Sequence, residues 1–251
     1  NGDWTLDERD NTHLTTDYLQ VRMKAIFETL EILHTDTLGG ELFITPVGSN
    51  RILKVEEVNI TYDGVSQKAY RCYFLGEQDG SKVENKWKVG DQARSKSFNL
   101  TQGKYHNVGN HYYWRLVIGV STETVEIDGK KYHYVDLSDI DKDAASDEPM
   151  LDDILNQCGN RTDITRQSCL VFSAVDTYSP CITLYHGVDG YTFNNKEYVN
   201  YGVNHSTNKA FFNVYGDMYV GDRPTKENGY EGSSYIKYDS ATKQVSVKGK
   251  I

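Results

Sequence analysis

Two short stretches, WKVGDQAR at Trp87–Arg94 and HYYWR at His111–Arg115, decide the fold class of this 251-residue chain. Each combines aromatic or β-branched residues with charged residues in alternation, a composition that is typical of β-strands. Neither stretch contains a nucleophile beside a base, or histidines and cysteines at the spacing of metal ligands. They predict a β-built structural or binding protein, and they give no reason to expect an enzyme.

The overall composition agrees with a folded, acidic and β-rich protein. The chain has 19 Tyr, 8 Phe and 3 Trp, which supply large surfaces for burial, and its 21 Gly and 4 Pro suit many tight turns. Its length permits one large β domain or two or three small ones. The net charge of −9 disfavours nucleic-acid binding and indicates an acidic surface that keeps the protein soluble. No apolar run approaches the ~20 residues of a membrane-spanning helix, so membrane insertion is not expected.

The chain is predicted to have three parts joined by a linker. Residues 1–39 are expected to be a polar, irregular segment followed by one helix, because apolar residues recur at helical spacing between Tyr18 and Thr35. Residues 40–138 predict a β barrel or sandwich of seven or eight strands, in which Asp128-Gly129 is the strongest hairpin turn. Residues 139–153 form an acidic linker, and residues 154–251 predict a second, distal β domain.

The first and last residues predict that the chain is a fragment. It opens on Asn1 without an initiator methionine, and Val245–Ile251 has the pattern of a strand that is cut in mid-course. We therefore expect further domains in the longer protein.

Motifs that carry chemistry are not found, so no catalytic residue, cofactor or metal ligand is predicted. Asp139, Asp141 and Asp143 begin like a calcium loop, but Ala144 stands where glycine is required and Met150 where a bidentate glutamate is required. A solvated acidic linker is therefore the favoured interpretation, with a calcium site of another type left open. The seven histidines are scattered, and no nucleophile elbow or phosphate-binding loop occurs.

The four cysteines do not predict a metal site either. Cys72, Cys158, Cys169 and Cys181 contain no C-x-x-C pair, which disfavours zinc. They suit small buried thiols, and a disulfide is left open.

Aromatic residues of the first β region are the candidates for a binding surface. They could stack on a sugar, although strand alternation sends half of the rings into a core, so core packing is the favoured interpretation. Arg94 and Arg115 are expected to pair with nearby carboxylates or to stack on tyrosine rings, in a structural role. The candidate glycan-binding residues are Tyr105, Tyr112, Tyr113, Trp114, Tyr132 and Tyr134.

Several groups of residues between positions 18 and 251 carry a resemblance to known proteins. The groups are Val21–Ala25 with Gly39–Pro46, Tyr70–Phe74, Trp87–Asn99 with Tyr112–Arg115, Asn156–Asp163 with Arg166-Gln167, and Gly216–Arg223 with Tyr235–Tyr238 and Val247–Ile251. In the same order, they resemble segments of tail or tail-fibre proteins of tailed phages, which prophages of gut anaerobes often encode. Cys158 stands where an apolar residue is usual in these proteins, and Ser95 where cysteine is frequent.

The resemblance implies a virion structural protein of the tail fibre, tail tip or baseplate, made in the cytoplasm of the bacterial host. It implies a β-rich homotrimer that contacts copies of itself and other tail proteins, and it brings no catalytic residues. Burial of the helical stripe along a three-fold axis and of strand edges between subunits is compatible with it. The expected function is tail assembly or attachment to the host surface, where a glycan is a candidate partner. The alternative is a non-catalytic carbohydrate-binding module, and an enzyme that degrades glycans or cell walls has less support.

Overall fold

The computed structural model describes residues 3–6, 12–15, 40–47, 49–78, 81–97, 111–227, 232 and 234–249. The chain divides into two units, Asn1–Thr37 and Leu38–Ile251. In the first unit, β1 (Asp3–Leu6) and β2 (Thr12–Thr15) pair antiparallel, where the sequence predicts an irregular segment. The helix predicted between Tyr18 and Thr35 lies outside the described residues.

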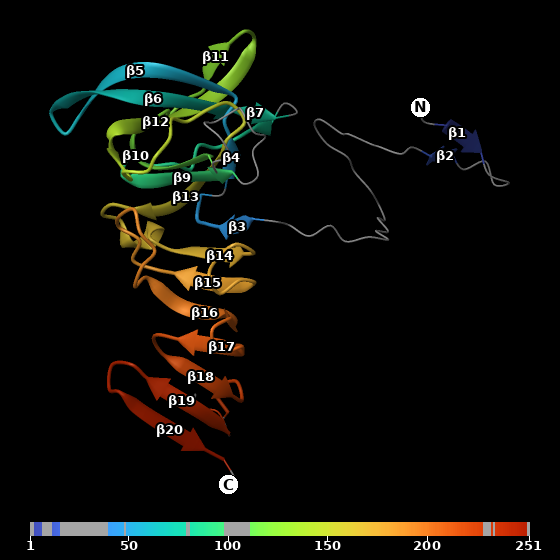
Figure 1. The fold of residues 1–251 in the computed structure, drawn as a ribbon, viewed down its shortest axis with the longest axis vertical. Coiled ribbons are helices and arrows are strands. Elements are labelled where there is room, and N and C mark those ends of the chain that lie inside the picture. Colours follow the sequence, from blue (N-terminus) through green and yellow to red (C-terminus); the bar gives the residue numbers. More distant parts are fainter. Residues whose placement is uncertain are drawn as a thin grey trace. The chain divides into compact units, whose positions relative to one another are not determined.

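The mainly-β prediction is confirmed for the second unit. The described residues form antiparallel strands together with one 3-10 helix, η1 (Ile164–Arg166). The first sheet has the strand order β4-β13-β9-β10-β12-β6-β5, with β11 paired to β12 (Figure 1). A separate two-stranded ladder, β7–β8, lies next to β12, where Lys131 pairs with Glu77. The strands of the first sheet are β4 (Ser49–Arg51), β5 (Lys54–Tyr62), β6 (Val65–Leu75), β9 (Asp91–Ser97), β10 (His111–Val120), β11 (Val125–Ile127), β12 (Lys130–Lys142) and β13 (Ile154–Asn160); the small ladder is β7 (Glu77–Gln78) and β8 (Ser81–Lys82).

The two end strands of the first sheet, β4 and β5, are consecutive in the chain. The Ile52 N–H donates to the Asp153 carbonyl at 2.9 Å, beside β13, and the Leu53 N–H donates to the Tyr73 carbonyl at 2.7 Å, in β6. Two residues therefore carry the chain from one end of the strand order to the other. The buried core of this sheet is made of Ile52, Tyr70, Cys72, Phe74, Trp87, Ala93, Tyr113, Val117, Val135, Leu137 and Leu155.

Two Asp-Gly turns connect strands of this sheet. Asp128 and Gly129 have φ values of 50° and 72°, and Asp63 and Gly64 have φ values of 49° and 75°. Positive φ at both central residues is the geometry of a type I′ turn, whose twist matches that of the two paired strands. The hairpin predicted at Asp128-Gly129 is thus present between β11 and β12.

A second sheet has the strand order β17-β16-β15-β14-β3, and a third has β18-β19-β20. Figure 1 shows these strands from β14 in yellow to β20 in red. The strands are β3 (Glu41–Ile44), β14 (Cys169–Ser173), β15 (Cys181–Tyr185), β16 (Glu197–Asn204), β17 (Lys209–Val214), β18 (Met218–Gly221), β19 (Tyr235–Asp239) and β20 (Gln244–Lys248).

The sheet boundary does not coincide with the acidic segment 139–153. β3 precedes the first sheet in the sequence but pairs with β14, and β13 follows the acidic segment but pairs with β9 and β4. The acidic segment itself continues the hydrogen bonding of β10, since the N–H of Asp143 donates to the Trp114 carbonyl and that of Asp147 to the Tyr112 carbonyl. Its backbone is thus satisfied by the first sheet, and the segment packs against that sheet.

Candidate functional site

Strand β10, which contains the HYYWR stretch, has both of its faces covered. Tyr113 is fully buried inside the first sheet. Trp114 points to the opposite side, where it is 3% exposed and packs against Cys158, Val171 and Tyr185. Because neighbouring side chains of a strand point to opposite faces, β10 contributes Tyr113 to the core of the first sheet and Trp114 to a second core, which lies against the second sheet.

The predicted aromatic candidates do not form one platform. Tyr105 lies outside the described residues. Tyr132 and Tyr134 are partly exposed, and both make edge contacts with the Tyr73 ring, at 6.4 and 5.8 Å between centroids. Of the candidates in the described part of the chain, Tyr112 and Trp114 line a cavity.

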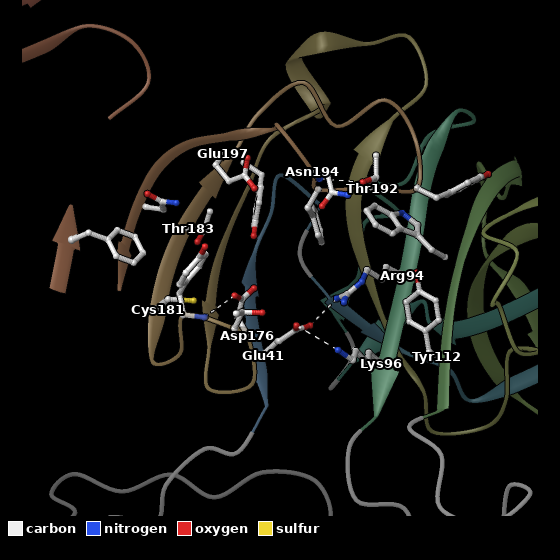
Figure 2. A pocket seen from close by; sticks show the side chains of 18 residues that line it. Glu41, Arg94, Lys96, Tyr112, Asp176, Cys181, Thr183, Thr192, Asn194 and Glu197 are labelled. Atoms are coloured by element: carbon white, nitrogen blue, oxygen red, sulfur yellow. Dashed lines mark hydrogen bonds and ion pairs between the residues drawn. The ribbon is translucent and has the colours of Figure 1, made fainter. Parts of the chain in front are cut away.

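This cavity of about 670 Å³ lies between strands β9 and β10 of the first sheet and the inner face of the second sheet (Figure 2). Rings and polar groups alternate around its wall. The rings are Tyr112, Trp114, Tyr178, Tyr185, Tyr191, Phe193 and Phe211, and the principal polar residues are Glu41, Arg94, Lys96, Asp176, Thr183, Asn194, Glu197 and Asn200.

Arg94 is held in the wall of this cavity by rings and by one carboxylate. Its guanidinium lies 5.1 Å from the Phe43 ring centroid and 5.5 Å from that of Phe193, and its Nη1 is 2.9 Å from a carboxylate oxygen of Glu41. Burial opposes the charge on Arg94, but the neighbouring Cys158 and Glu41 more than offset it and raise its pKa. The structural pairing and ring stacking predicted for Arg94 are present.

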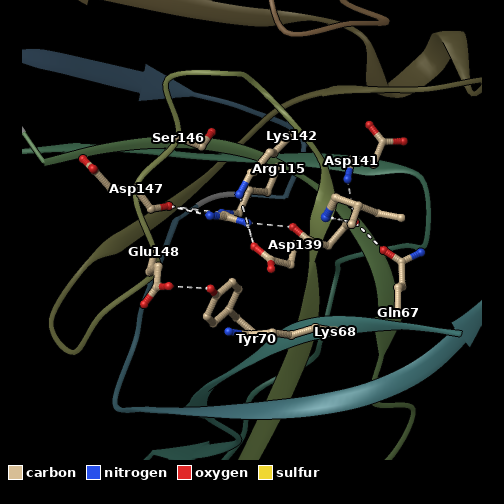
Figure 3. Close-up of polar contacts among 12 residues, drawn as sticks. Gln67, Lys68, Tyr70, Arg115, Asp139, Asp141, Lys142, Ser146, Asp147 and Glu148 are labelled. Atoms are coloured by element: carbon tan, nitrogen blue, oxygen red, sulfur yellow. Dashed lines mark hydrogen bonds and ion pairs between the residues drawn. The ribbon is translucent and has the colours of Figure 1, made fainter.

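Arg115, the second arginine for which such a structural role is predicted, is also held by a carboxylate and a ring (Figure 3). It is fully buried, donates to the carbonyls of Ser138 and Asp147, and lies 3.3 Å from a carboxylate oxygen of Asp139. The guanidinium also sits 4.9 Å from the Tyr70 ring centroid. Arg115 therefore ties the acidic segment to β10 and β12.

A second cavity of about 520 Å³ extends the first along β16 and β17. The two cavities share Tyr178, Glu197, Asn200 and Phe211 in their walls, so they form one groove, which we call the inner groove. Asn213, which lies opposite Asn200 across the β16–β17 ladder, lines its distal part. These residues were missed in the sequence, although the alternation of Asn200 and Asn204 with Val199, Tyr201 and Val203 in β16 indicates a strand with one polar and one apolar face.

Three buried polar atoms of groove residues have no hydrogen-bond partner among the described residues. They are Trp114 Nε1, Arg94 Nε and Asn200 Oδ1. Buried polar atoms are normally satisfied, so unpaired ones beside a cavity indicate a wall that can accept a polar ligand or ordered water.

The groove does not present a reactive constellation. Cys181 lines it, but burial raises the pKa of the Cys181 thiol, whereas a nucleophilic cysteine needs a lowered pKa. Burial likewise raises the pKa of the Tyr112, Tyr185 and Tyr191 hydroxyls above their ordinary value, so these groups stay neutral.

The carboxylates of the acidic segment are separately engaged. Asp139 pairs with Lys142 and Arg115, Asp141 pairs with Arg161, and Asp143 accepts from the Tyr112 hydroxyl at 2.7 Å. Within the described ranges, no three His, Cys, Asp or Glu side chains are grouped so that they could hold a metal ion. The same part of the chain has no helix with the length and apolarity required to span a bilayer.

Comparison of the chain with protein-family models, with curated proteins and with solved structures finds no match.

Proposed function

We propose that this chain is a structural component of a phage tail fibre or tail tip, that it assembles as a homotrimer, and that it takes part in tail assembly or host-surface attachment. In this role it is made in the host cytoplasm and stands in the virion tail, in contact with other tail proteins. The resemblance in sequence suggests the family and the number of subunits. An exposed apolar surface on the second sheet supports self-association independently.

This surface is the outer face of the second sheet, and we call it the apolar ladder. Each of the five strands contributes two apolar side chains that lie directly opposite those of its neighbours. The members are Leu42 and Ile44 of β3, Leu170 and Phe172 of β14, Ile182 and Leu184 of β15, Val199 and Tyr201 of β16, and Phe212 and Val214 of β17.

The ladder matches the largest apolar patches found on monomeric proteins. Phe212 is 64% exposed, Ile44 54% and Tyr201 53%. If a large free side chain offers roughly 150–250 Å², the exposed members leave on the order of 600 Å² of apolar area open. The largest patch on a typical monomer is about 300–600 Å² and is often an interaction site.

The third sheet repeats the pattern. One of its faces carries Val220, Ile236 and Val247 in one row, and Met218, Tyr238 and Val245 in the next. Val245 and Val247 are 68% and 62% exposed. If both faces are covered, they bury on the order of 1,000 Å² per chain, which exceeds the roughly 800 Å² that each partner contributes to a standard interface.

The chemistry of the ladder favours other copies of this chain as its cover. All ten members are uncharged, so the ladder offers nothing to a charged partner, and the net charge of −9 resides on other surfaces. Three copies can turn such faces toward a common three-fold axis and bury them against one another.

The test is the mass of the full chain in solution. We expect light scattering at micromolar concentration to give three times the 28.6 kDa of one chain. The double variant Tyr201→Asp/Phe212→Asp places two carboxylates directly opposite each other on the ladder, and its expected mass is that of one chain. Burying unpaired charges in the interface would cost more than the contact gains.

A matched control carries the same added charge on the same hairpin. Ser206→Asp/Thr207→Asp changes two exposed residues of the β16–β17 turn and should keep the trimeric mass. Circular dichroism establishes that both variants retain the β fold. A wild-type mass of one chain would contradict the proposal, and a trimeric mass for the ladder variant would remove the ladder from the interface.

A further inference from the structure

The two faces of the second sheet differ sharply in chemistry. Residues of β16 and β17 that point away from the apolar ladder include Asn200, Asn204, Lys209, Phe211 and Asn213, and these five line the inner groove. Since the groove and the ladder lie on opposite faces of one sheet, assembly through the ladder leaves the groove open. A binding role for the groove therefore goes beyond the proposed assembly role and does not depend on it.

The junction of the two cavities combines the groups that recognise a sugar ring. Tyr178 is 42% exposed, and its ring meets the Phe211 ring edge-on at 5.3 Å between centroids. Such a ring offers an apolar face to the C–H groups of a sugar. Glu197 and Asn200 line the same junction, and their oxygens can accept hydrogen bonds from sugar hydroxyls.

Asn200 gives the strongest indication of a ligand. Its Oδ1 is buried and unpaired among the described residues, and the residue borders both cavities. An acceptor left in this state is satisfied when a hydroxyl donor arrives in the groove. Asn213, directly opposite, adds an amide with one acceptor and two donors, which suits neighbouring hydroxyls on one ring.

The charge of the wall selects a neutral ligand. Arg94 and Lys96 both approach Glu41, at 2.9 and 3.8 Å, so their charge is compensated within the wall. Asp176 and Glu197 add negative charge and Lys209 adds a positive charge in the distal part, so the formal charges of the wall balance. A strongly charged polymer would meet no net opposite charge here.

The size and position of the groove favour a short chain of sugars over an extended peptide. The connected cavities of about 670 and 520 Å³ exceed the volume of one sugar ring. The groove runs over the face of the sheet, where the backbone hydrogen bonds of the strands are already used, so a peptide could not add to it as a further strand. We propose that the inner groove binds a neutral oligosaccharide of several units.

The experiment is a glycan array printed with neutral glucan, galactan and mannan oligosaccharides of increasing length, followed by calorimetric titration of the best binder. We expect binding that strengthens with chain length. Tyr178→Ala and Asn200→Ala should each weaken it at least tenfold, because one removes the ring face and the other an acceptor. Tyr178→Phe keeps the ring and should retain the affinity.

Tyr198→Ala is the matched control, since Tyr198 is 45% exposed in β16 and is not part of the groove wall. It should leave the affinity unchanged. Absence of binding to every neutral oligosaccharide at millimolar concentration would overturn the proposal, as would a preference for acidic glycans or peptides. Binding that survives both Tyr178→Ala and Asn200→Ala would place the sugar elsewhere. The mass of each variant, measured in parallel, separates these outcomes from a failure of trimer assembly.

Discussion

Replacement of Asp91 by alanine is expected to lower the free energy of unfolding by about 3–5 kcal/mol, the usual cost of breaking a buried ion pair by removing one partner. Asp91 is completely buried at the start of β9. Its carboxylate receives Arg166 Nε at 2.7 Å and Nη2 at 2.6 Å, Asn160 Nδ2 at 2.9 Å and the Lys88 N–H at 2.8 Å. Alanine removes the acceptor that these donors share, and Arg166 keeps the Lys86 carbonyl as a hydrogen-bond partner.

Urea unfolding followed by circular dichroism measures the effect, with all variants at one protein concentration because assembly adds to apparent stability. Glu123→Ala removes an exposed carboxylate and should change the free energy of unfolding by less than about 0.5 kcal/mol. Asp91→Asn keeps the side-chain volume and should fall between the two. A loss of unfolding free energy below about 1 kcal/mol for Asp91→Ala would show that the ion pair and hydrogen bonds of Asp91 contribute little to stability.

The ion pair and hydrogen bonds of Asp91 join two motifs that lie far apart in the sequence. Asp91 belongs to the WKVGDQAR stretch, whereas Asn160 and Arg166 belong to the segment Asn156–Gln167, about 70 residues further on. Periodicity predicts a strand at the first motif, but it contains no information on pairing with the second. The pairing follows from the tertiary fold, in which β13 lies beside β9.

Local features of the fold were predictable from the sequence. Asp128-Gly129 favours a type I′ turn on its own, and charged residues such as Arg94 and Arg115 within aromatic strands require a carboxylate or a ring as partner. Both expectations rest on short-range chemistry. The structure places Glu41 beside Arg94 and Asp139 beside Arg115, as that chemistry demands.

Long-range features were not predictable in the same way. β3 pairs within the second sheet and β13 within the first, and these pairings depend on which strand edges meet in the folded chain. The acidic composition of residues 139–153 predicts a solvated linker, because composition contains no information on the backbone hydrogen bonds that this segment makes to β10. The inner groove also depends on contacts between segments that are distant in the sequence. It gathers side chains from β9, β10 and the second sheet, and no single window of sequence contains them.

The apolar ladder was predictable from the sequence only in part. The segment Cys181–Tyr185 alternates buried and exposed residues, yet both sets are largely apolar. A strand of this kind has two faces to cover. The structure shows one face covered by the core around Trp114 and the other exposed, which is why the proposal of self-association rests on structure as well as on resemblance.

Replacement of Trp114 by alanine is expected to lower the free energy of unfolding by about 3–5 kcal/mol, as for other buried tryptophans. Trp114 is 3% exposed, and its ring lies 4.8 Å from that of Phe193 and 6.1 Å from that of Tyr191. It also packs with Cys158 of β13 and Val171 of β14, so it fills the space between the two sheets. Alanine leaves a cavity between β13 of the first sheet and β14 of the second sheet.

The location of the damage distinguishes this variant from Asp91→Ala. Hydrogen exchange in Trp114→Ala should rise more in β14 and β15, which lose a packing surface, than in β6 and β12, whose core residues lie inside the first sheet. Trp114→Phe keeps an aromatic ring and should lose about half as much stability, while Val125→Ala, at a position that is 38% exposed, should lose less than about 1 kcal/mol. Uniform loss of protection from hydrogen exchange across both sheets would show that the two sheets unfold as one cooperative unit. Trp114 would then stabilise both sheets to the same extent. Greater loss in the second sheet would show that β10 carries two separable cores, joined by the alternation of Tyr113 and Trp114.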